Sequence, residues 1–183
     1  MPAYPIEIPL SKSKLTKLLI ASAIFLAAGL WILVAQPETG NPIFNAFIVK
    51  NTAGALGIVM GLPGIIFFTR KLADKRPGLI IDSMGVTDNS SSLSLGFIPW
   101  SDITSVESKI VQVSVASKQK FVAIKLRNPE VYIDSQTSAL KRKAMQVGLK
   151  HSDSPVNISA NGLNIKYDYL LQLLQDNYRA NRY

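Results

Sequence analysis

The sequence predicts an α+β protein in which a transmembrane helical hairpin precedes a small antiparallel β-barrel or sandwich. Two uncharged apolar runs, 18–35 and 51–69, each have about the 18–20 residues that a helix needs to cross a hydrocarbon core ~30 Å thick. After Pro77 the pattern changes to short apolar runs with a period of two, which is typical of antiparallel strands. The predicted parts are an N-terminal arm (1–14), the hairpin (15–76) and a second domain (77–183).

The hairpin is predicted as two helices, at about 15–36 and 46–70, joined by a turn that contains Pro37, Gly40 and Pro42. A secretory signal peptide also begins with basic residues, but its apolar region has only ~7–15 residues and requires no second span. An uncleaved pair of helices is therefore favoured over a signal peptide.

Lysines and arginines crowd the outer ends of the two apolar runs, whereas the connecting segment carries Lys50 as its single basic residue. Under the positive-inside rule this asymmetry predicts a multi-pass protein with both termini in the cytoplasm. Basic groups at helix ends also attract anionic headgroups. The candidate membrane-surface contacts are Lys12, Lys14, Lys17, Arg70, Lys71, Lys75 and Arg76.

Small residues recur every four positions in both predicted helices. They are Ala53, Gly57 and Gly61 in the second helix and Ala23 and Ala27 in the first. Small residues at this spacing let two helix backbones approach closely in lipid. They are candidates for packing within the hairpin, and a homodimer formed through Gly57 and Gly61 is the alternative.

The basic excess is concentrated around the apolar runs. The net charge is +8, with Lys and Arg exceeding Asp and Glu by five in residues 1–76 and by three in residues 77–183. An excess of three over the second domain argues against nucleic-acid binding. The chain has no cysteine and a single histidine, His151, which excludes disulfides and leaves few options for a metal site.

Six or seven antiparallel strands are expected in the second domain, separated by turns at intervals of about ten residues. Residues 82–85 predict a tight turn between the first two strands, with Gly85 suited to positive φ. Val111, Val113 and Val115 alternate with polar residues. The other predicted strands are 79–81, 86–88, 95–99, 121–126, 131–133 and 155–159.

Two helices are expected beside these strands. The inserted one covers 135–148, with Gly148 as its stop signal and an apolar stripe of Leu140, Ala144 and Val147 at helical spacing. The closing helix is predicted to begin after Asn164 as its cap. Its apolar stripe consists of Tyr167, Leu170, Leu171, Leu174 and Tyr178.

The segment 79–82, the pair Gly85-Val86 and the run Ile98-Pro99-Trp100-Ser101-Asp102-Ile103 resemble the bacterial pleckstrin-homology-like (PH-like) membrane proteins of uncharacterised function. Those proteins often carry two transmembrane helices before the PH-like domain. The resemblance implies a PH-like barrel with a closing helix, in which Gly85, Pro99 and Trp100 define the fold. It also implies a bacterial inner-membrane location and an interaction or scaffold role rather than an enzymatic one.

No motif for catalysis, nucleotide binding or metal binding is present in the sequence. We therefore expect no catalytic residue, no cofactor and no metal. The leading hypothesis is a membrane protein whose cytoplasmic PH-like domain binds a protein partner or assembles with itself. The alternative is a module that senses anionic lipid through 70–76 and 141–143, and a small membrane-bound enzyme is a distant third.

Overall fold

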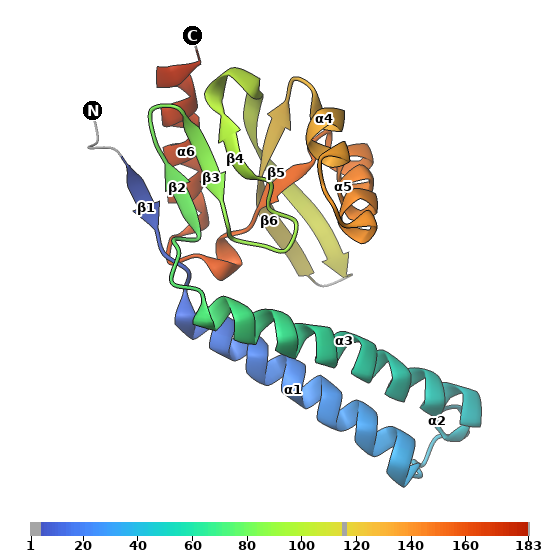
Figure 1. Cartoon of the computed structure of the whole chain (residues 1–183). Coiled ribbons are helices and arrows are strands. Elements are labelled where there is room, and N and C mark those ends of the chain that lie inside the picture. The colour runs from blue at the N-terminus through green and yellow to red at the C-terminus, as the bar shows by residue number, and fades with distance from the viewer. Residues whose placement is uncertain (1–4, 115–116, 183) are drawn as a thin grey trace. The chain divides into compact units, whose positions relative to one another are not determined.

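The chain folds into two compact units, and the first residues do not belong to the unit that follows them in the sequence. The computed structural model describes residues 5–114 and 117–182 (Figure 1). One unit consists of Lys12–Lys75, and the other combines Met1–Ser11 with Arg76–Tyr183. The prediction treated 1–14 as a separate arm, whereas the structure places its described strand in the β-rich unit.

The unit formed by Lys12–Lys75 is a pair of long helices, α1 (Lys12–Ala35) and α3 (Phe47–Ala73), with the short helix α2 (Pro42–Asn45) between them. At 1.5 Å per residue the two long helices measure about 36 and 40 Å. Both are long and apolar enough to cross a membrane. Asn41 caps α2 by accepting a hydrogen bond from the Ile43 N–H at 2.9 Å. Helix α3 continues through Pro63.

The first sheet of the β-rich unit has four antiparallel strands in the order β1-β2-β3-β4. Strand β1 pairs with β2 although the whole hairpin lies between them in the sequence, with Ile6 opposite Ile81 and Ile8 opposite Leu79. The Gly78 N–H donates to the Ile8 carbonyl at 2.9 Å, so the chain leaves and re-enters this sheet at adjacent points. The strands are β1 (Ile6–Ile8), β2 (Leu79–Ile81), β3 (Gly85–Asp88) and β4 (Gly96–Pro99).

The turn between β2 and β3 is held by Asp82. Its carboxylate accepts from the Met84 and Gly85 N–H groups at 2.8 and 2.9 Å. Gly85 does not have a positive φ, so that part of the prediction was wrong. A glycine is required there for space, because a Cβ at this position would lie 2.2 Å from the Ile98 carbonyl oxygen.

The second sheet is antiparallel with the order β5-β6-β7. Its strands are β5 (Ile103–Ser114), β6 (Ser117–Leu126) and β7 (Val156–Ile158), and the short 3₁₀ helix η1 (Trp100–Asp102) connects it to the first sheet. The predicted strands at 79–81, 86–88, 95–99, 121–126 and 155–159 are thus confirmed, although β6 begins at Ser117 rather than at 121. Val111 and Val113 lie in β5, and Val115 lies outside the described residues.

Helices follow β6 and close the chain. They are α4 (Pro129–Asp134), α5 (Ala139–Ser152), the 3₁₀ helix η2 (Ala160–Gly162) and α6 (Tyr167–Asn181). The predicted strand at 131–133 was wrong, because Pro129 occupies the first turn of a helix that begins there. Asn164 does not cap α6, which begins after Lys166. The Asn164 N–H instead donates to the Pro9 carbonyl at 2.9 Å.

Helix α5 buries a different face from the predicted one. Leu140 is 80% exposed and Val147 is 50% exposed, whereas Met145 is buried. Gly148 lies inside the helix, which ends at Asp153 in the left-handed conformation (φ 50°). The predicted stripe missed the buried face because three apolar residues at helical spacing cannot show which side of a short helix meets the core.

The core of the β-rich unit lies between the two sheets and α6. Leu170 and Leu174 of α6 are fully buried, as the apolar stripe predicted. Trp100 is 3% exposed, and its indole N–H donates to the Asp82 carbonyl at 2.9 Å. Each layer contributes to one cluster, which includes Ile8, Leu79, Ile81, Val86, Ile98, Val122, Ile124, Val156 and Ile158.

Candidate functional site

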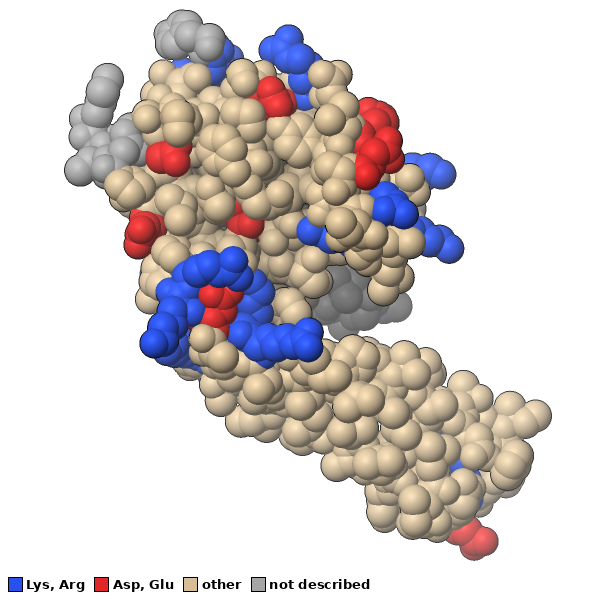
Figure 2. All heavy atoms as spheres, viewed as in Figure 1, with Lys and Arg blue, Asp and Glu red and all other residues tan. Residues whose placement is uncertain are grey.

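Basic side chains gather at one end of the hairpin, where α1 begins and α3 ends (Figure 2). Lys71 and Asp74 form an ion pair of 3.9 Å there, so one acidic group lies among the basic ones. The opposite end of the hairpin holds Glu38 and Lys50. Antiparallel helices bring both flanks together, and they place these predicted surface contacts at the same end: Lys12, Lys14, Lys17, Arg70, Lys71 and Lys75.

The hairpin exposes apolar side chains on its outer faces. In the apolar stretch of 18 residues that could span a membrane, only 11% of α1 and 17% of α3 is buried. The core helix of a soluble protein is mostly buried, so these helices differ from it. Trp31, Phe44 and Phe47 are exposed towards the α2 end, and aromatic rings are enriched at the two membrane–water interfaces. Other exposed apolar residues are Ile24, Phe25, Leu56, Val59, Met60 and Leu62.

Glycines form the contact between α1 and α3. A Cβ on Gly57 would lie 2.8 Å from the Gly29 Cα, and one on Gly61 would lie 2.6 Å from the Leu26 backbone nitrogen. Gly54 meets Leu33 and Gly64 meets Ser22 in the same way. Gly57 and Gly61 therefore pack inside the hairpin.

The three alanines predicted to join them, Ala23, Ala27 and Ala53, are exposed instead. The contact on α3 follows Gly54, Gly57, Gly61 and Gly64, with alternating spacings of three and four. Because a helix has 3.6 residues per turn, residues spaced alternately by three and four stay on the face that contacts the partner helix. Residues spaced strictly by four move gradually around the helix and away from that face. The prediction chose the wrong face for these alanines for this reason.

Lys50 is nearly buried at the α2 end of the hairpin. Its ammonium donates to the Gln36 carbonyl at 3.0 Å, just after the last residue of α1. A cation at a helix C-terminus satisfies carbonyls that lack helical partners and complements the helix dipole. Lys50 thus joins the end of α1 to the start of α3.

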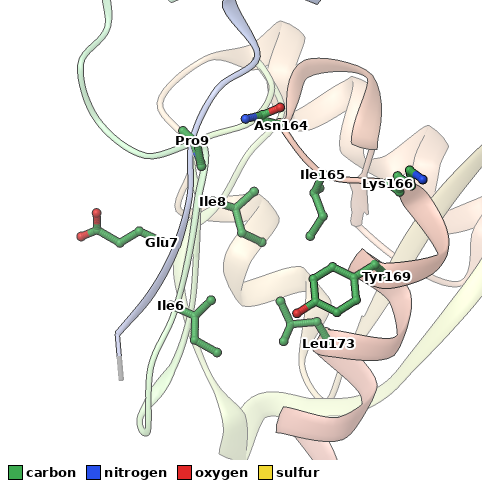
Figure 3. A pocket seen from close by; sticks show the side chains of 9 residues that line it. All are labelled: Ile6, Glu7, Ile8, Pro9, Asn164, Ile165, Lys166, Tyr169 and Leu173. Carbon is green, nitrogen blue, oxygen red and sulfur yellow. The ribbon is translucent and has the colours of Figure 1, made fainter. Parts of the chain in front are cut away.

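A groove lies between β1 and α6 in the β-rich unit, with a cavity volume of about 390 Å³. Ile6 and Ile8 point from β1 towards Ile165 and Leu173, and Glu7 points away (Figure 3). Tyr169 lines the helical side and is 61% exposed. The remaining lining residues are Pro9, Asn164 and Lys166.

A second cavity of about 580 Å³ lies beside α5. Its lining is mainly apolar and includes Phe121, Met145 and Val156, with Asp88 and Lys109 among its polar members. Leu93, Ile110, Val111 and Val147 line it and are each at least 40% exposed. The volume is within the range of small-molecule pockets.

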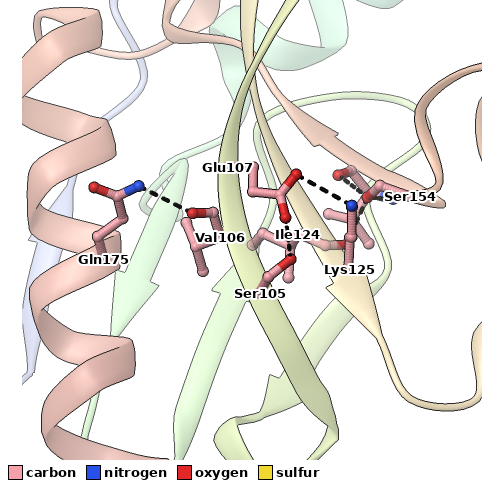
Figure 4. A network of polar contacts seen from close by, with 8 residues as sticks. Ser105, Val106, Glu107, Ile124, Lys125, Ser154 and Gln175 are labelled. Atoms are coloured by element: carbon pink, nitrogen blue, oxygen red, sulfur yellow. Dashed lines mark hydrogen bonds and ion pairs between the residues drawn. The ribbon is translucent and has the colours of Figure 1, made fainter.

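Polar contacts connect α6, β5, β6 and the start of β7 in the β-rich unit (Figure 4). Gln175 of α6 donates to the Val106 carbonyl of β5 at 3.0 Å. Ser154 donates to the Ile124 carbonyl at 2.5 Å, which holds the start of β7 against β6. The hydrogen bond from Ser105, together with the one from Lys125, lowers the pKa of Glu107. These contacts hold β5, β6, β7 and α6 together.

Two basic residues of α5, Lys141 and Arg142, are bound to backbone carbonyls. Lys141 donates to the Ser94 carbonyl at 2.7 Å, and Arg142 donates to the Gln136 carbonyl at 2.5 Å. Burial lowers the pKa of the Lys141 ammonium, and the Asp88 carboxylate partly offsets this shift. Only Lys143 of the predicted lipid-binding triplet is exposed.

Tyr132 and Asp102 form a hydrogen-bonded pair between α4 and η1. The phenol of Tyr132 donates a hydrogen bond to the Asp102 carboxylate. Burial, together with this hydrogen bond and the nearby negative charge, raises the pKa of Tyr132 to about 12. The neutral phenol of Tyr132 thus connects α4 to η1 through its hydrogen bond to Asp102.

Within residues 5–114 and 117–182, no three His, Cys, Asp or Glu side chains are grouped so that they would hold a metal ion. No family model, curated protein or solved structure matches the chain. Sequence reasoning identified the hairpin and its basic end but missed both cavities, because each is bordered by segments that are far apart in the sequence.

Proposed function

We propose that this protein is a membrane-anchored interaction module. The hairpin spans the membrane, and a PH-like domain binds a protein partner at the membrane surface. The observation that carries this proposal is the insertion of two membrane-length helices between β1 and β2. Two covalent connections to adjacent strands would hold the domain close to the lipid and fix how it is presented.

The architecture of the β-rich unit supports the PH-like assignment. Four antiparallel strands, three further antiparallel strands and a C-terminal helix enclose one apolar cluster. Gly85 begins β3 and Trp100 begins η1, and both belong to the segments that carry the resemblance. Both residues are tightly packed. Two antiparallel sheets that share one core with a C-terminal helix support this part of the proposal.

We place both termini in the cytoplasm of a bacterial cell, with the hairpin in the inner membrane. The basic end of the hairpin carries six Lys and Arg residues in Lys12–Lys75, and the α2 end carries only Lys50. The absence of cysteine makes this orientation testable, since each introduced cysteine is unique. Thr39→Cys should react with a membrane-impermeant maleimide in intact cells, and Ser91→Cys should react only after lysis; the reverse pattern would refute the orientation.

Tethering lets a weak interaction suffice, because it raises the effective concentration of the domain at the surface. The test of function is crosslinking and co-isolation from native membranes with the full chain. A protein partner should be captured, and it should also be captured by a chain in which Ser11 is joined to Arg76 through a short Gly-Ser loop. Capture of nothing by the full chain would overturn the proposal.

Lipid recognition is the second candidate, favoured by the basic side chains that gather at one end of the hairpin (Figure 2). Salt-sensitive preference of the reconstituted protein for anionic over neutral lipid would support it. The α5 triplet contributes little to this candidate, since Lys141 and Arg142 are bound to backbone carbonyls.

A further inference from the structure

We propose that the β1 edge beside α6 binds an extended peptide of a protein partner as an additional strand, with the pattern apolar–basic–apolar opposite Ile6, Glu7 and Ile8. This inference rests on the proposed function and identifies the site and the chemistry of the partner. Strand β1 is the outermost strand of its sheet. Exposed edges of this kind accept peptides by β-augmentation.

The chain itself already occupies the next part of the same edge. The Asn164 N–H donates to the Pro9 carbonyl at 2.9 Å, and the Ser11 N–H donates to the Gly162 carbonyl at 2.8 Å. Leu10 and Leu163 form an antiparallel bridge between these two contacts. Residues 162–164 therefore act as a short strand added to the continuation of β1.

In an antiparallel strand the backbone N–H and C=O groups of successive residues point alternately to the two sides. This alternation shows which side the backbone groups of Glu7 face. The Ile8 carbonyl faces β2, where it accepts from Gly78. The polar groups of Pro9 and Ser11 face the other way, and the main-chain groups of Glu7 share their side. The chain leaves this line after Asn164, and Ile165 and Lys166 lead away from β1 into α6 (Figure 3). A peptide that continues the line would meet Glu7 next.

The groove beside this edge suits alternating side chains. Ile6 and Ile8 point into it, opposite Ile165, Tyr169 and Leu173 (Figure 3). Apolar side chains at every second position of a bound peptide would be directed to the same face. They would also cover Tyr169, which is 61% exposed. A cavity of about 390 Å³ has room for two such side chains.

Glu7 determines which peptide residue is preferred between the two apolar ones. It points away from the groove (Figure 3), so the peptide residue opposite Glu7 lies on that outer face. Opposite charges at directly paired positions are favourable and like charges are unfavourable. A lysine or arginine is therefore preferred there. The same rule disfavours a second copy of this chain as the occupant, because two-fold pairing about Glu7 would set two carboxylates against each other.

The test measures binding of a fluorescent synthetic peptide with the central sequence Val-Lys-Val to the full chain in lipid nanodiscs. Binding should be saturable, and a Val-Glu-Val peptide should bind roughly three- to tenfold more weakly. In Glu7→Lys this preference should reverse. A Val-Lys-Val peptide with N-methylated central amides should lose binding, because it cannot form the ladder; a ligand held only by the apolar cavity would be unaffected.

A matched pair of helix variants locates the groove. Tyr169→Asp should weaken binding of Val-Lys-Val, whereas Arg179→Asp, at an exposed position of the same helix, should not. Three results would each overturn the inference. They are an absence of saturable binding, an unchanged preference for Val-Lys-Val over Val-Glu-Val in Glu7→Lys, and binding of the methylated peptide. A native partner captured equally by the full chain and by Glu7→Lys and Tyr169→Asp would overturn it while leaving the proposed function intact.

Discussion

Trp100 joins the two sheets through its ring and its indole N–H. In Trp100→Phe the Asp82 carbonyl loses a buried partner and the smaller ring leaves a void, so we expect a loss of about 1–3 kcal/mol in the free energy of unfolding. Thermal or denaturant unfolding of the full chain in detergent measures this. The control is Phe97→Leu on β4, at a side chain that is 46% exposed, with an effect within about 0.5 kcal/mol. Equal effects would contradict the burial argument.

Tyr132 makes the stability depend on pH in the alkaline range. Its pKa is raised to about 12 in the folded chain, whereas an unfolded tyrosine ionises near pH 10. The contribution to stability is therefore complete below about pH 10 and is lost as the pH rises towards 12. Ultraviolet titration of tyrosinate should show one late-titrating group that is absent in Tyr132→Phe. A Tyr132→Phe protein with an unchanged titration curve would show that another tyrosine is responsible.

At the scale of elements, the glycine contact decides whether α1 and α3 stay together. Gly61→Leu would place side-chain atoms against the Leu26 backbone, so we expect the hairpin to lose at least about 1–3 kcal/mol. Resistance of the folded protein to SDS in mixed micelles is the measurement. Ala53→Leu is the matched control, since Ala53 is exposed on the same helix and should change little. The opposite ranking would mean that the contact runs through Ala53.

At the scale of the whole molecule, the split course of the β-rich unit can be tested by removing the hairpin. The Gly78 N–H lies 2.9 Å from the Ile8 carbonyl oxygen, so a short Gly-Ser loop between Ser11 and Arg76 should replace Lys12–Lys75 without strain. We expect this protein to be soluble and to unfold cooperatively. Residues 77–183 alone lack β1 and the buried Ile8, and should be markedly less stable or aggregate through the exposed β2 edge. Equal stability of the two would show that β1 is dispensable.

Local patterns in the sequence were sufficient to predict the elements with long, continuous signals. Two uninterrupted apolar runs specify membrane-length helices, because length and hydropathy need no partner to be read. The period-two runs around Ile80 and Ile124 and the stripe of α6 likewise identified strands and a helix correctly, and with them the α+β class. Basic residues before the first apolar run and after the second predicted that, once the helices pair, they would gather at one end of the hairpin.

The way these elements are joined could not be predicted, because it depends on packing between segments that are far apart in the chain. The three residues Ile6–Ile8 are too short for their alternation to be distinguished from a loop, and their partner strand lies about 70 positions later in the chain. The face of α3 that meets α1 and the groove between β1 and α6 likewise depend on which surfaces pack together. Such choices rest on packing between distant segments, and no local pattern encodes them.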